Sequence, residues 1–351
     1  MNGFYSRFSN VYMTVPEISL PDEKVDNNEI LRRIKANFSG VDKEFKKIER
    51  VLKKSFDYNG CSVRYWEKDG EQKIGSNAAK VAESLLQRVN VKPEELSMII
   101  CGSISRPYLE PCVAAEIAFR LGINSVHAFD VTCACSSLLQ AAYTGATFLN
   151  DNQDIKYVLC CANELPFKVA DYNVQSVEEL RKKIASYTIG SASAAVLISK
   201  KPFINEGFKV NSFRSMTYPE TWDACITPLA DEMVTDSYKL FESCKKYLIN
   251  EIVTHLKQLN WNIEDVSQII SHQTGDYFLQ WLGSSIPGFD ENKLLKEQHC
   301  YGNTAGVSVF LALHDYVRSN RSKTGDKILL VVPAGGMTMV TAGISYEPEQ
   351  K

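Results

Sequence analysis

The chain has 351 residues, of which 44% are apolar and 23% are charged, and its formal net charge is −3. This composition is typical of a globular protein, and the charge argues against a general affinity for nucleic acid or an anionic membrane. No apolar run reaches the roughly 20 residues that span a bilayer, and the first residues lack the apolar core of a signal peptide. The sequence therefore predicts a cytoplasmic protein with no membrane span and no nucleic-acid partner.

The ten cysteines raise the question of disulfides or a metal centre. No Cys-x-x-Cys or His-x-x-x-His spacing occurs, so we predict no bound metal. Free buried thiols in a reducing compartment are the better interpretation, because five cysteines stand inside apolar segments. These five are Cys101, Cys133, Cys135, Cys160 and Cys161.

Short apolar strands alternate with amphipathic helices along the first 200 residues, an order typical of α/β proteins. The pattern predicts helices over 76–91, 112–122 and 135–150. It predicts strands over 97–103, 125–131, 157–161 and 191–199.

The same order of elements recurs in the rest of the chain. We predict helices over 237–259 and 303–317, and strands over 266–271, 328–333 and 337–345. The two halves share this order but little identity, which indicates a gene duplication. The predicted domains are therefore residues 1–200 and 201–351.

Three stretches show no clear periodicity: 42–68, 168–188 and 212–235. Irregular segments of that length are uncommon inside a compact domain and are often functional. We therefore predict that these stretches are insertions over a binding site.

Cys135 and Asn303 stand at matching places in the two halves, since each opens a predicted helix rich in Ala, Ser and Gly. Both are expected near the pseudo-twofold axis. The free N–H groups and the dipole of a helix N-terminus favour negative charge, so the Cys135 thiol is predicted to ionise readily. His272 follows the strand 266–271, at the edge where the loops of a parallel sheet form active sites.

A Cys, a His and an Asn at the ends of core elements form a coherent set for nucleophilic catalysis. Cys135 is suited to accept an acyl group from a thioester, while His272 and Asn303 donate hydrogen bonds to a thioester carbonyl. The N–H groups of Cys135 and Gly336 are candidates for an oxyanion hole. Structural roles are the alternative for each residue: a buried thiol with Cys133 as the competing nucleophile, a core histidine, an Asn cap and a glycine turn.

These motifs resemble those of the ketoacyl synthase III branch of the thiolase superfamily, over nearly the whole chain. Segment 127–137 (HAFDVTCACSS) resembles the nucleophile segment of that family, in which the catalytic Cys follows an Asp by five residues. This resemblance identifies Cys135 as the nucleophile and leaves Cys133 to packing. Segments 271–273 (Ser-His-Gln) and 302–304 (Gly-Asn-Thr) resemble the motifs that carry the catalytic His and Asn.

The resemblance implies a thiolase fold, which is a duplicated five-layer αβαβα sandwich, and a homodimer or a dimer with a related subunit. It also implies acyl transfer to Cys135 from a coenzyme A or carrier-protein thioester, with no further cofactor. A Claisen condensation with a malonyl-type or second acyl thioester would follow, with Gln273 beside His272 in the substrate site. An acyl carrier protein is a candidate partner.

Departures from the housekeeping members of the family point to specialised metabolism. Asp276 follows the His-Gln motif where those members place a basic residue that docks the acidic carrier. Arg64 is the nearest candidate for the residues that hold coenzyme A. Glu110 stands where those members have an apolar residue, and it resembles the Glu that condensing enzymes of the bacterial olefin pathway use as a base from the partner subunit. A solvated Glu at a helix N-terminus is the alternative.

Two further functions are compatible with the same residues. A Cys-dependent O- or N-acyltransferase would keep Cys135 and His272 but form an ester or amide, so Asn303 would matter less. A thiolase-fold partner subunit without catalysis would form no acyl adduct on Cys135.

Overall fold

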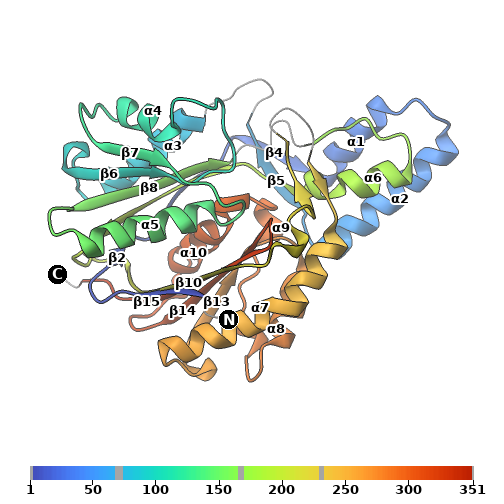
Figure 1. Ribbon diagram of the computed structural model, residues 1–351. Helices are drawn as coiled ribbons and strands as arrows, with labels where there is room; N and C mark the ends of the chain where they lie inside the picture. Colours follow the sequence, from blue (N-terminus) through green and yellow to red (C-terminus); the bar gives the residue numbers. More distant parts are fainter. Residues whose placement is uncertain (1–2, 68–73, 165–169, 229–232, 350–351) are drawn as a thin grey trace.

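The computed structural model describes residues 3–67, 74–164, 170–228 and 233–349 (Figure 1). Two sets of strands make its central sheet. The first set is β6 (Leu96–Cys101), β7 (His127–Asp130), β8 (Tyr157–Glu164) and β9 (Ala192–Ser199). The second set is β10 (Phe208–Thr217), β13 (Val266–Ser271), β14 (Lys327–Ala334) and β15 (Thr338–Tyr346).

Three short strands near the N-terminus complete the sheet: β1 (Phe4–Arg7), β2 (Tyr12–Met13) and β3 (Glu17–Ser19). β2 pairs with β9 on one side and with β10 on the other, so it joins the two sets of strands. The resulting order is β13-β14-β15-β10-β2-β9-β8-β6-β7, with β1 beside β10 and β3 beside β9.

The two sets of strands are built alike. β6 lies parallel to β8, which lies antiparallel to β9; β13 lies parallel to β14, which lies antiparallel to β15. β7 pairs with the outer side of β6, and the matching place beside β13 holds an isolated bridge between Ile269 and Leu294. The two halves of the sheet therefore repeat one topology, and the domain division at residue 200 stays a prediction.

Helices and strands form five layers. In Figure 1, α5 (Ser137–Asp151) and α10 (Ser308–Arg318) lie between the upper strands and the lower strands. Their apolar faces share one core with the inner faces of both sheet halves. α3 (Ile74–Arg88) and α4 (Val113–Arg120) cover the outer face of the first half, and α7 (Ser237–Leu259) and α8 (Asp276–Ser285) cover that of the second. This αβαβα order confirms the predicted fold class.

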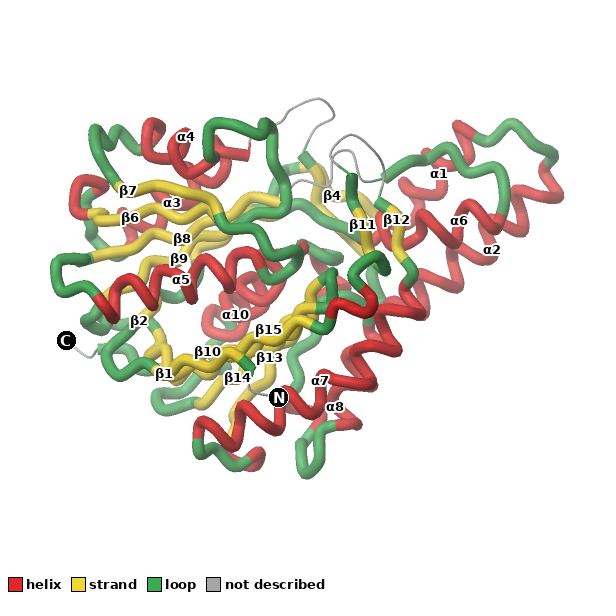
Figure 2. The backbone as a smooth tube through the Cα atoms, viewed as in Figure 1, coloured by secondary structure: helices red, strands yellow, loops and turns green. Residues whose placement is uncertain are grey.

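A smaller lobe stands beside these layers. It comprises α1 (Asn27–Asn37), α2 (Asp42–Asn59), α6 (Val177–Lys183) and the hairpin of β4 (Glu23–Asp26) with β5 (Val63–Trp66). Figure 2 shows its three helices together at the right. The lobe has an apolar core of its own, to which α2 contributes four side chains of one helical face: Phe45, Ile48, Leu52 and Phe56.

The three stretches are mostly regular, so the prediction of irregular structure is wrong, but residues of all three line the large cavity described below. Stretches 42–68 and 168–188 contain α2, β5 and α6, and stretch 212–235 contains the end of β10 and the hairpin of β11 (Cys225–Ile226) with β12 (Val234–Thr235). The apolar face of α2 is a single narrow row among Lys, Arg, Asp and Glu, which conceals its helical period. Residues 68, 168–169 and 229–232 of these stretches lie outside the described residues.

Both helices that were predicted to start at site residues start later. α5 begins at Ser137, and α10 begins at Ser308 after the 3₁₀ turn Ala305–Val307. Ala134 (φ 46°) and Ala305 (φ 47°) have left-handed backbone conformations, which cannot continue a right-handed helix. Cys135 and Asn303 therefore lie on tight turns just before the helices.

The remaining helix, α9 (Gln298–Tyr301), is a single turn that leads into Asn303. In the part of the chain described here, every helix is too short or too polar to cross a bilayer. All ten cysteines are free thiols, as predicted.

Candidate active site

A cavity of about 1460 Å³ lies where the smaller lobe meets the layered body. Its wall is mostly apolar and comes from the lobe, from α7 and α8 and from the β11–β12 hairpin. Four residues predicted for catalysis line this cavity: Cys135, His272, Asn303 and Gly336. The structure thus brings together residues that are up to 201 positions apart in the sequence (135 to 336).

The turn that carries Cys135 is closed by its own hydrogen bonds. The Ser137 Oγ donates to the Ala134 carbonyl (2.7 Å) and accepts from the Cys133 N–H (2.8 Å). The left-handed Ala134 turns the chain so that Cys135 faces the cavity, whereas Cys133 is not among its lining residues. This geometry favours Cys135 over Cys133 as the nucleophile.

Cys135 is half-buried in the cavity wall, and the loss of hydration at its thiol dominates its titration. Burial, the Cys225 thiol and the Glu164 carboxylate raise the pKa of Cys135 to about 12, whereas hydrogen bonds from the backbone N–H groups of Gly335 and Cys135 lower it. The prediction of a readily ionised thiol is therefore wrong. The loss of hydration raises the pKa of the thiol by more than the N–H groups of the turn lower it.

His272 follows β13 and is held by Ser308. Its Nδ1 lies 2.7 Å from the Ser308 Oγ, which also accepts from the Gln273 N–H (3.1 Å). A hydroxyl that already accepts one hydrogen bond favours donating its own proton to Nδ1, and this arrangement puts the imidazole proton on Nε2. Nε2 is buried with no partner among the described residues. Burial lowers the pKa of His272 to about 4, so the ring is neutral at pH 7.

Asn303 is oriented by its own turn. Its Oδ1 accepts from the Ala305 N–H (2.9 Å), so the amide nitrogen, Nδ2, is left to face the cavity. The backbone of Asn303 is bonded to Thr188 and Gly190 on the neighbouring turn. A Cβ on Gly302 would collide with the Thr188 carbonyl oxygen, so only glycine allows these two turns to meet.

Arg64 and Gln273 do not reach the cavity. The Arg64 guanidinium is buried in the smaller lobe, where it donates to the Asn27 Oδ1 (2.8 Å) and lies over the Phe56 ring. The Gln273 amide is buried too, and it donates to the carbonyls of Ser271 (2.8 Å) and Leu295 (3.2 Å). Both side chains therefore connect backbone segments instead of facing a substrate.

Glu110 is exposed and does not line the cavity of its own chain. Its alternative role at the N-terminus of α4 belongs to Asp130, whose carboxylate accepts from the N–H groups of Val113 (2.8 Å) and Ala114 (2.9 Å). Glu110 is left without a structural partner in the described chain.

Several lining residues were not singled out from the sequence. Glu164 and Cys225 lie in the same cavity as Cys135, and Lys54 and Arg181 are the cations of its wall. The signal for Glu164 was available, because Asn163 and Glu164 follow the apolar run 157–162 at the carboxyl end of a strand. The other three lie in stretches that were taken as irregular.

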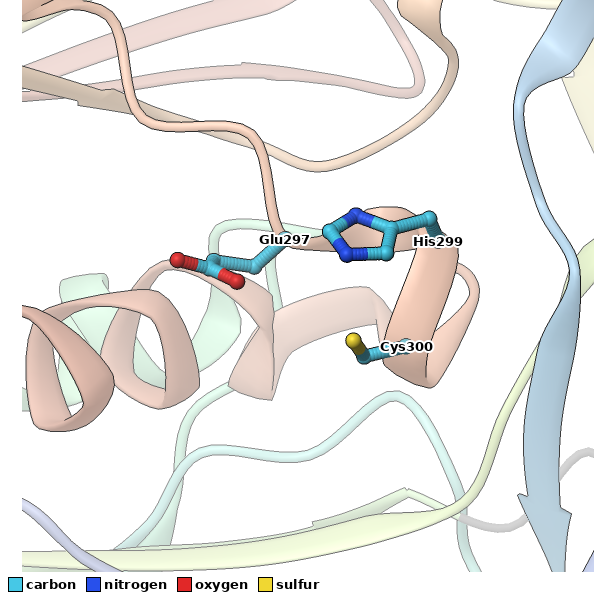
Figure 3. Close-up of side chains that lie close together, drawn as sticks. All are labelled: Glu297, His299 and Cys300. Atoms are coloured by element: carbon cyan, nitrogen blue, oxygen red, sulfur yellow. The ribbon is translucent and has the colours of Figure 1, made fainter.

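One group of three described residues could hold a metal ion: Glu297, His299 and Cys300. The Glu297 carboxylate already bonds to Arg321 (2.9 Å), and in Figure 3 its side chain extends away from the imidazole of His299. His299 is exposed. These contacts favour a surface ion pair over a metal centre.

Two family models match the chain. One is 3-oxoacyl-[acyl-carrier-protein (ACP)] synthase III, C terminal, over residues 256–346, and the other is the thiolase N-terminal domain over residues 71–193. The beta-ketoacyl-[acyl-carrier-protein] synthase III of Sulfurovum sp. is 25% identical over 306 residues, 83% of this chain and 86% of the relative. The acyl-CoA:acyl-CoA alkyltransferase of Xanthomonas campestris pv. campestris is 26% identical over 293 residues, 81% and 85% of the two chains.

Crystal structures of Xanthomonas campestris OleA share the fold. One variant matches with a TM-score of 0.85 and 23% identity over 97% of this chain and 99% of that one. Another, with bound lauric acid and lauroyl-CoA, gives 0.85 and 23% over 96% and 99%. At this level of identity the structural match speaks for the fold alone.

Proposed function

Since the chain belongs to the ketoacyl synthase III-like condensing enzymes of the thiolase superfamily, we propose that it acylates Cys135 and then forms a carbon–carbon bond by Claisen condensation. The observation that carries this proposal is the common cavity. There a thiol shares the wall with two polar groups: the Nε2 of His272, which is buried with no partner among the described residues, and the amide nitrogen of Asn303, whose Oδ1 is held by the Ala305 N–H.

In the first half-reaction, the sulfur of Cys135 attacks the carbonyl of an acyl thioester. A carbon–sulfur bond forms, the departing thiol takes the proton of Cys135, and an acyl-Cys135 remains. In this proposal the N–H groups of Cys135 and Gly336 bind the developing oxyanion, which is supported by the presence of both residues in the cavity wall. Gly336 has open space around its Cα, which leaves room for this oxygen.

In the second half-reaction, the carbonyl of another thioester binds to the Nε2–H of His272 and to the amide of Asn303. Loss of carbon dioxide from a malonyl group, or of a proton from an acyl group, gives an enolate that attacks the acyl carbon on Cys135. The sulfur of Cys135 then leaves as the new carbon–carbon bond forms. Donors in a buried site stabilise the enolate oxygen far more than donors in water.

The cavity favours long acyl groups. Its volume of about 1460 Å³ exceeds the roughly 300–1,000 Å³ of common ligand pockets. Its wall includes apolar side chains from both the lobe and the body, among them Val51, Phe56, Ile184, Leu240, Phe241 and Phe278. We propose long-chain acyl thioesters as substrates, with a second acyl thioester or a malonyl-type thioester as the extender, in specialised metabolism in the cytoplasm.

Lys54 and Arg181 replace Arg64 in our proposal for binding the thioester carrier. Both cations line the cavity, and phosphate groups of coenzyme A or of a carrier protein's arm would pair with them. Lys54 ends a row of exposed cations on α2, formed with Lys43, Lys47 and Arg50. The spacing of four, three and four residues puts this row on one face, opposite the buried one.

A dimer through the open edge of β7 fits the exposed apolar side chains beside it. Leu109 is 73% exposed, Phe119 is 82% exposed and Phe148 is 42% exposed. We propose a homodimer in which this surface is buried. Glu110 follows Leu109 in the same loop, so the dimer would carry Glu110 toward the partner and allow it to act there as the base.

The proposal is tested by incubating the purified chain with acyl-CoAs of increasing length, alone and with malonyl-CoA. Intact-protein mass spectrometry reports the acyl adduct, and mass spectrometry of extracted products reports the new carbon–carbon bond. We expect both with long acyl chains. An adduct followed only by ester or amide products with added alcohols or amines would instead identify an O- or N-acyltransferase, and absence of any adduct would refute the proposal.

A further inference from the structure

Glu164 is a buried carboxylate that the proposed chemistry leaves unused. It is the last residue of β8, its side chain is only 2% exposed, and it lines the cavity with Cys135. Its charge is felt by the Cys135 thiol, which places the two groups near each other. A carboxylate in such a place is costly unless it is fully hydrogen-bonded.

Four donors surround this carboxylate. Oε1 accepts from the Ile104 N–H (3.0 Å), and Oε2 accepts from the Ser105 N–H (3.1 Å) and the Ser105 hydroxyl (2.9 Å). The Gly306 N–H is the fourth donor. A Cβ on Gly306 would lie 3.0 Å from Oε1, so this glycine keeps the approach open.

These bonds exclude one role for Glu164 and indicate another. An ionised carboxylate has about four lone-pair positions, and the four donors fill them. None is left to take a proton from a substrate, so Glu164 is not placed as a general base. Its bonds instead tie the end of β8 to two separate turns.

Both turns carry parts of the proposed site. The Gly306 N–H belongs to the turn whose Ala305 N–H orients the Asn303 side chain. Ile104 and Ser105 begin the loop that continues to Glu110. If the carboxylate lost these bonds, Asn303 and the loop to Glu110 would both be released from their places around Cys135.

We propose that Glu164 is a positioning residue for condensation: its ionised carboxylate fixes the Asn303 turn and the loop 104–110 around the acylated Cys135. This inference rests on the proposed condensation. Loss of the Glu164 carboxylate should slow the second half-reaction, because Asn303 holds the second thioester. The first half-reaction should be nearly independent of Glu164, because it does not use Asn303.

Protonation of Glu164 should therefore slow condensation in acid. Burial raises the pKa of Glu164 to about 7, against the lowering effect of its hydrogen bonds. As the pH falls through 7, the carboxyl gains a proton and can no longer accept four bonds. Cys101 and Cys135 are the titratable groups that interact with it, while Cys225 and His272 line the same cavity, and no cation among the described residues pairs with it. The thiols of Cys101 and Cys135 have raised pKa values and His272 a pKa of about 4, so none of these three titrates near pH 7.

The test compares Glu164→Gln and Glu164→Asp with the wild type in two assays on the full chain. One is the rate of Cys135 acylation, measured by intact mass. The other is the rate of product formation from the acylated enzyme between pH about 5.5 and about 8.5, a range that brackets the Glu164 titration. Glu251→Gln is a control for loss of a buried carboxylate elsewhere: Glu251 is 3% exposed and does not line the cavity, and because it is paired with Arg214 (2.8 Å), circular dichroism first checks that this variant is folded.

We expect Glu164→Gln to slow condensation roughly 10²-fold, the order of effect seen when one oxyanion donor is lost, while acylation changes less than about threefold. Its pH profile should lose the acid limb near pH 7. Glu164→Asp keeps the charge, so it should restore the limb and part of the rate. Equal losses in both assays, or an unchanged pH profile, would overturn the positioning role. Wild type that is acylated but never condenses would refute the proposed function itself, and the inference with it.

Discussion

The layered body and the smaller lobe line the same cavity, but they contribute different kinds of residue to it. The body supplies the turns that carry Cys135, His272 and Asn303, and each turn is held by backbone or hydroxyl hydrogen bonds. The lobe supplies a wall of apolar side chains and exposed cations from α2 and α6. The repeated topology therefore brings the proposed catalytic residues together, whereas the lobe adds part of the wall against which we propose that the acyl chain and its carrier bind.

The largest effect is expected at the nucleophile in the body. Cys135→Ala should abolish the acyl adduct and lower product formation at least roughly 10³-fold, because the proposed mechanism carries the acyl chain on this sulfur. Cys133→Ala is the matched control two residues away, and it should keep the adduct. Intact mass after exposure to a long-chain acyl-CoA decides between them. A residual adduct in the Cys135 variant would have to be mapped to Cys225, the other cysteine placed near it.

Asn303 tests whether the two half-reactions are separate within the body. Asn303→Ala should slow condensation by roughly 10²- to 10³-fold, since one of two donors to the enolate oxygen is lost. Acylation of Cys135 should continue, because that step uses the N–H groups of Cys135 and Gly336 instead. Single-turnover kinetics with pre-acylated enzyme measures the second step alone. Full product formation by this variant would favour the O- or N-acyltransferase over the condensing enzyme.

The body could be predicted from the sequence better than the lobe could. In the body, apolar strands and helices follow each other with the same spacing twice, so the strand that precedes His272 and the turns of Cys135 and Asn303 could be predicted. Their titration could not, because the burial that raises the pKa of Cys135 to about 12 depends on the whole cavity. Helix α2 was missed because only four of its eighteen residues are buried. Its charged majority concealed the apolar row.

Arg64 shows a second limit. A lone Arg in an N-terminal segment looks like a candidate for phosphate binding, since Arg forms strong bonds to phosphate. Its burial beneath α2 depends on Phe56, which lies eight residues earlier on that helix, and on Asn27, which lies 37 residues earlier, so the pattern around Arg64 does not signal it. Lys54 was overlooked for the opposite reason: it is one of several lysines, and only the fold shows which of them meets the cavity.

The lobe side of the wall should control acyl chain length. Ala185 follows α6 and lines the cavity, so Ala185→Leu would take space from the end of a long chain. Each buried methylene contributes about 0.8 kcal/mol, so excluding two of them should lower kcat/KM for the longest chains roughly tenfold. Short acyl-CoAs serve as the internal control and should be unaffected. Equal losses for short and long chains would place Ala185 away from the chain's path.

The smallest effect is expected for the cations of the lobe. Charge variants of these cations test whether the acyl donor is coenzyme A or a carrier protein. Lys54→Glu should raise KM for acyl-CoA by about fivefold at low salt without changing kcat, and the difference should shrink as salt is added.

Lys43 lies about 16 Å further along the same face of α2, at 1.5 Å per residue. Lys43→Glu should therefore leave KM for acyl-CoA unchanged, because one coenzyme A would not reach both positions while its thioester lies at Cys135. If an acidic carrier docks along α2, Lys43→Glu should raise KM for the acylated carrier. Lys53→Glu is the control for charge alone, since Lys53 is paired with Glu49 outside this row. Equal effects of all three variants would mean that general electrostatics, and not a carrier site on α2, explains the preference.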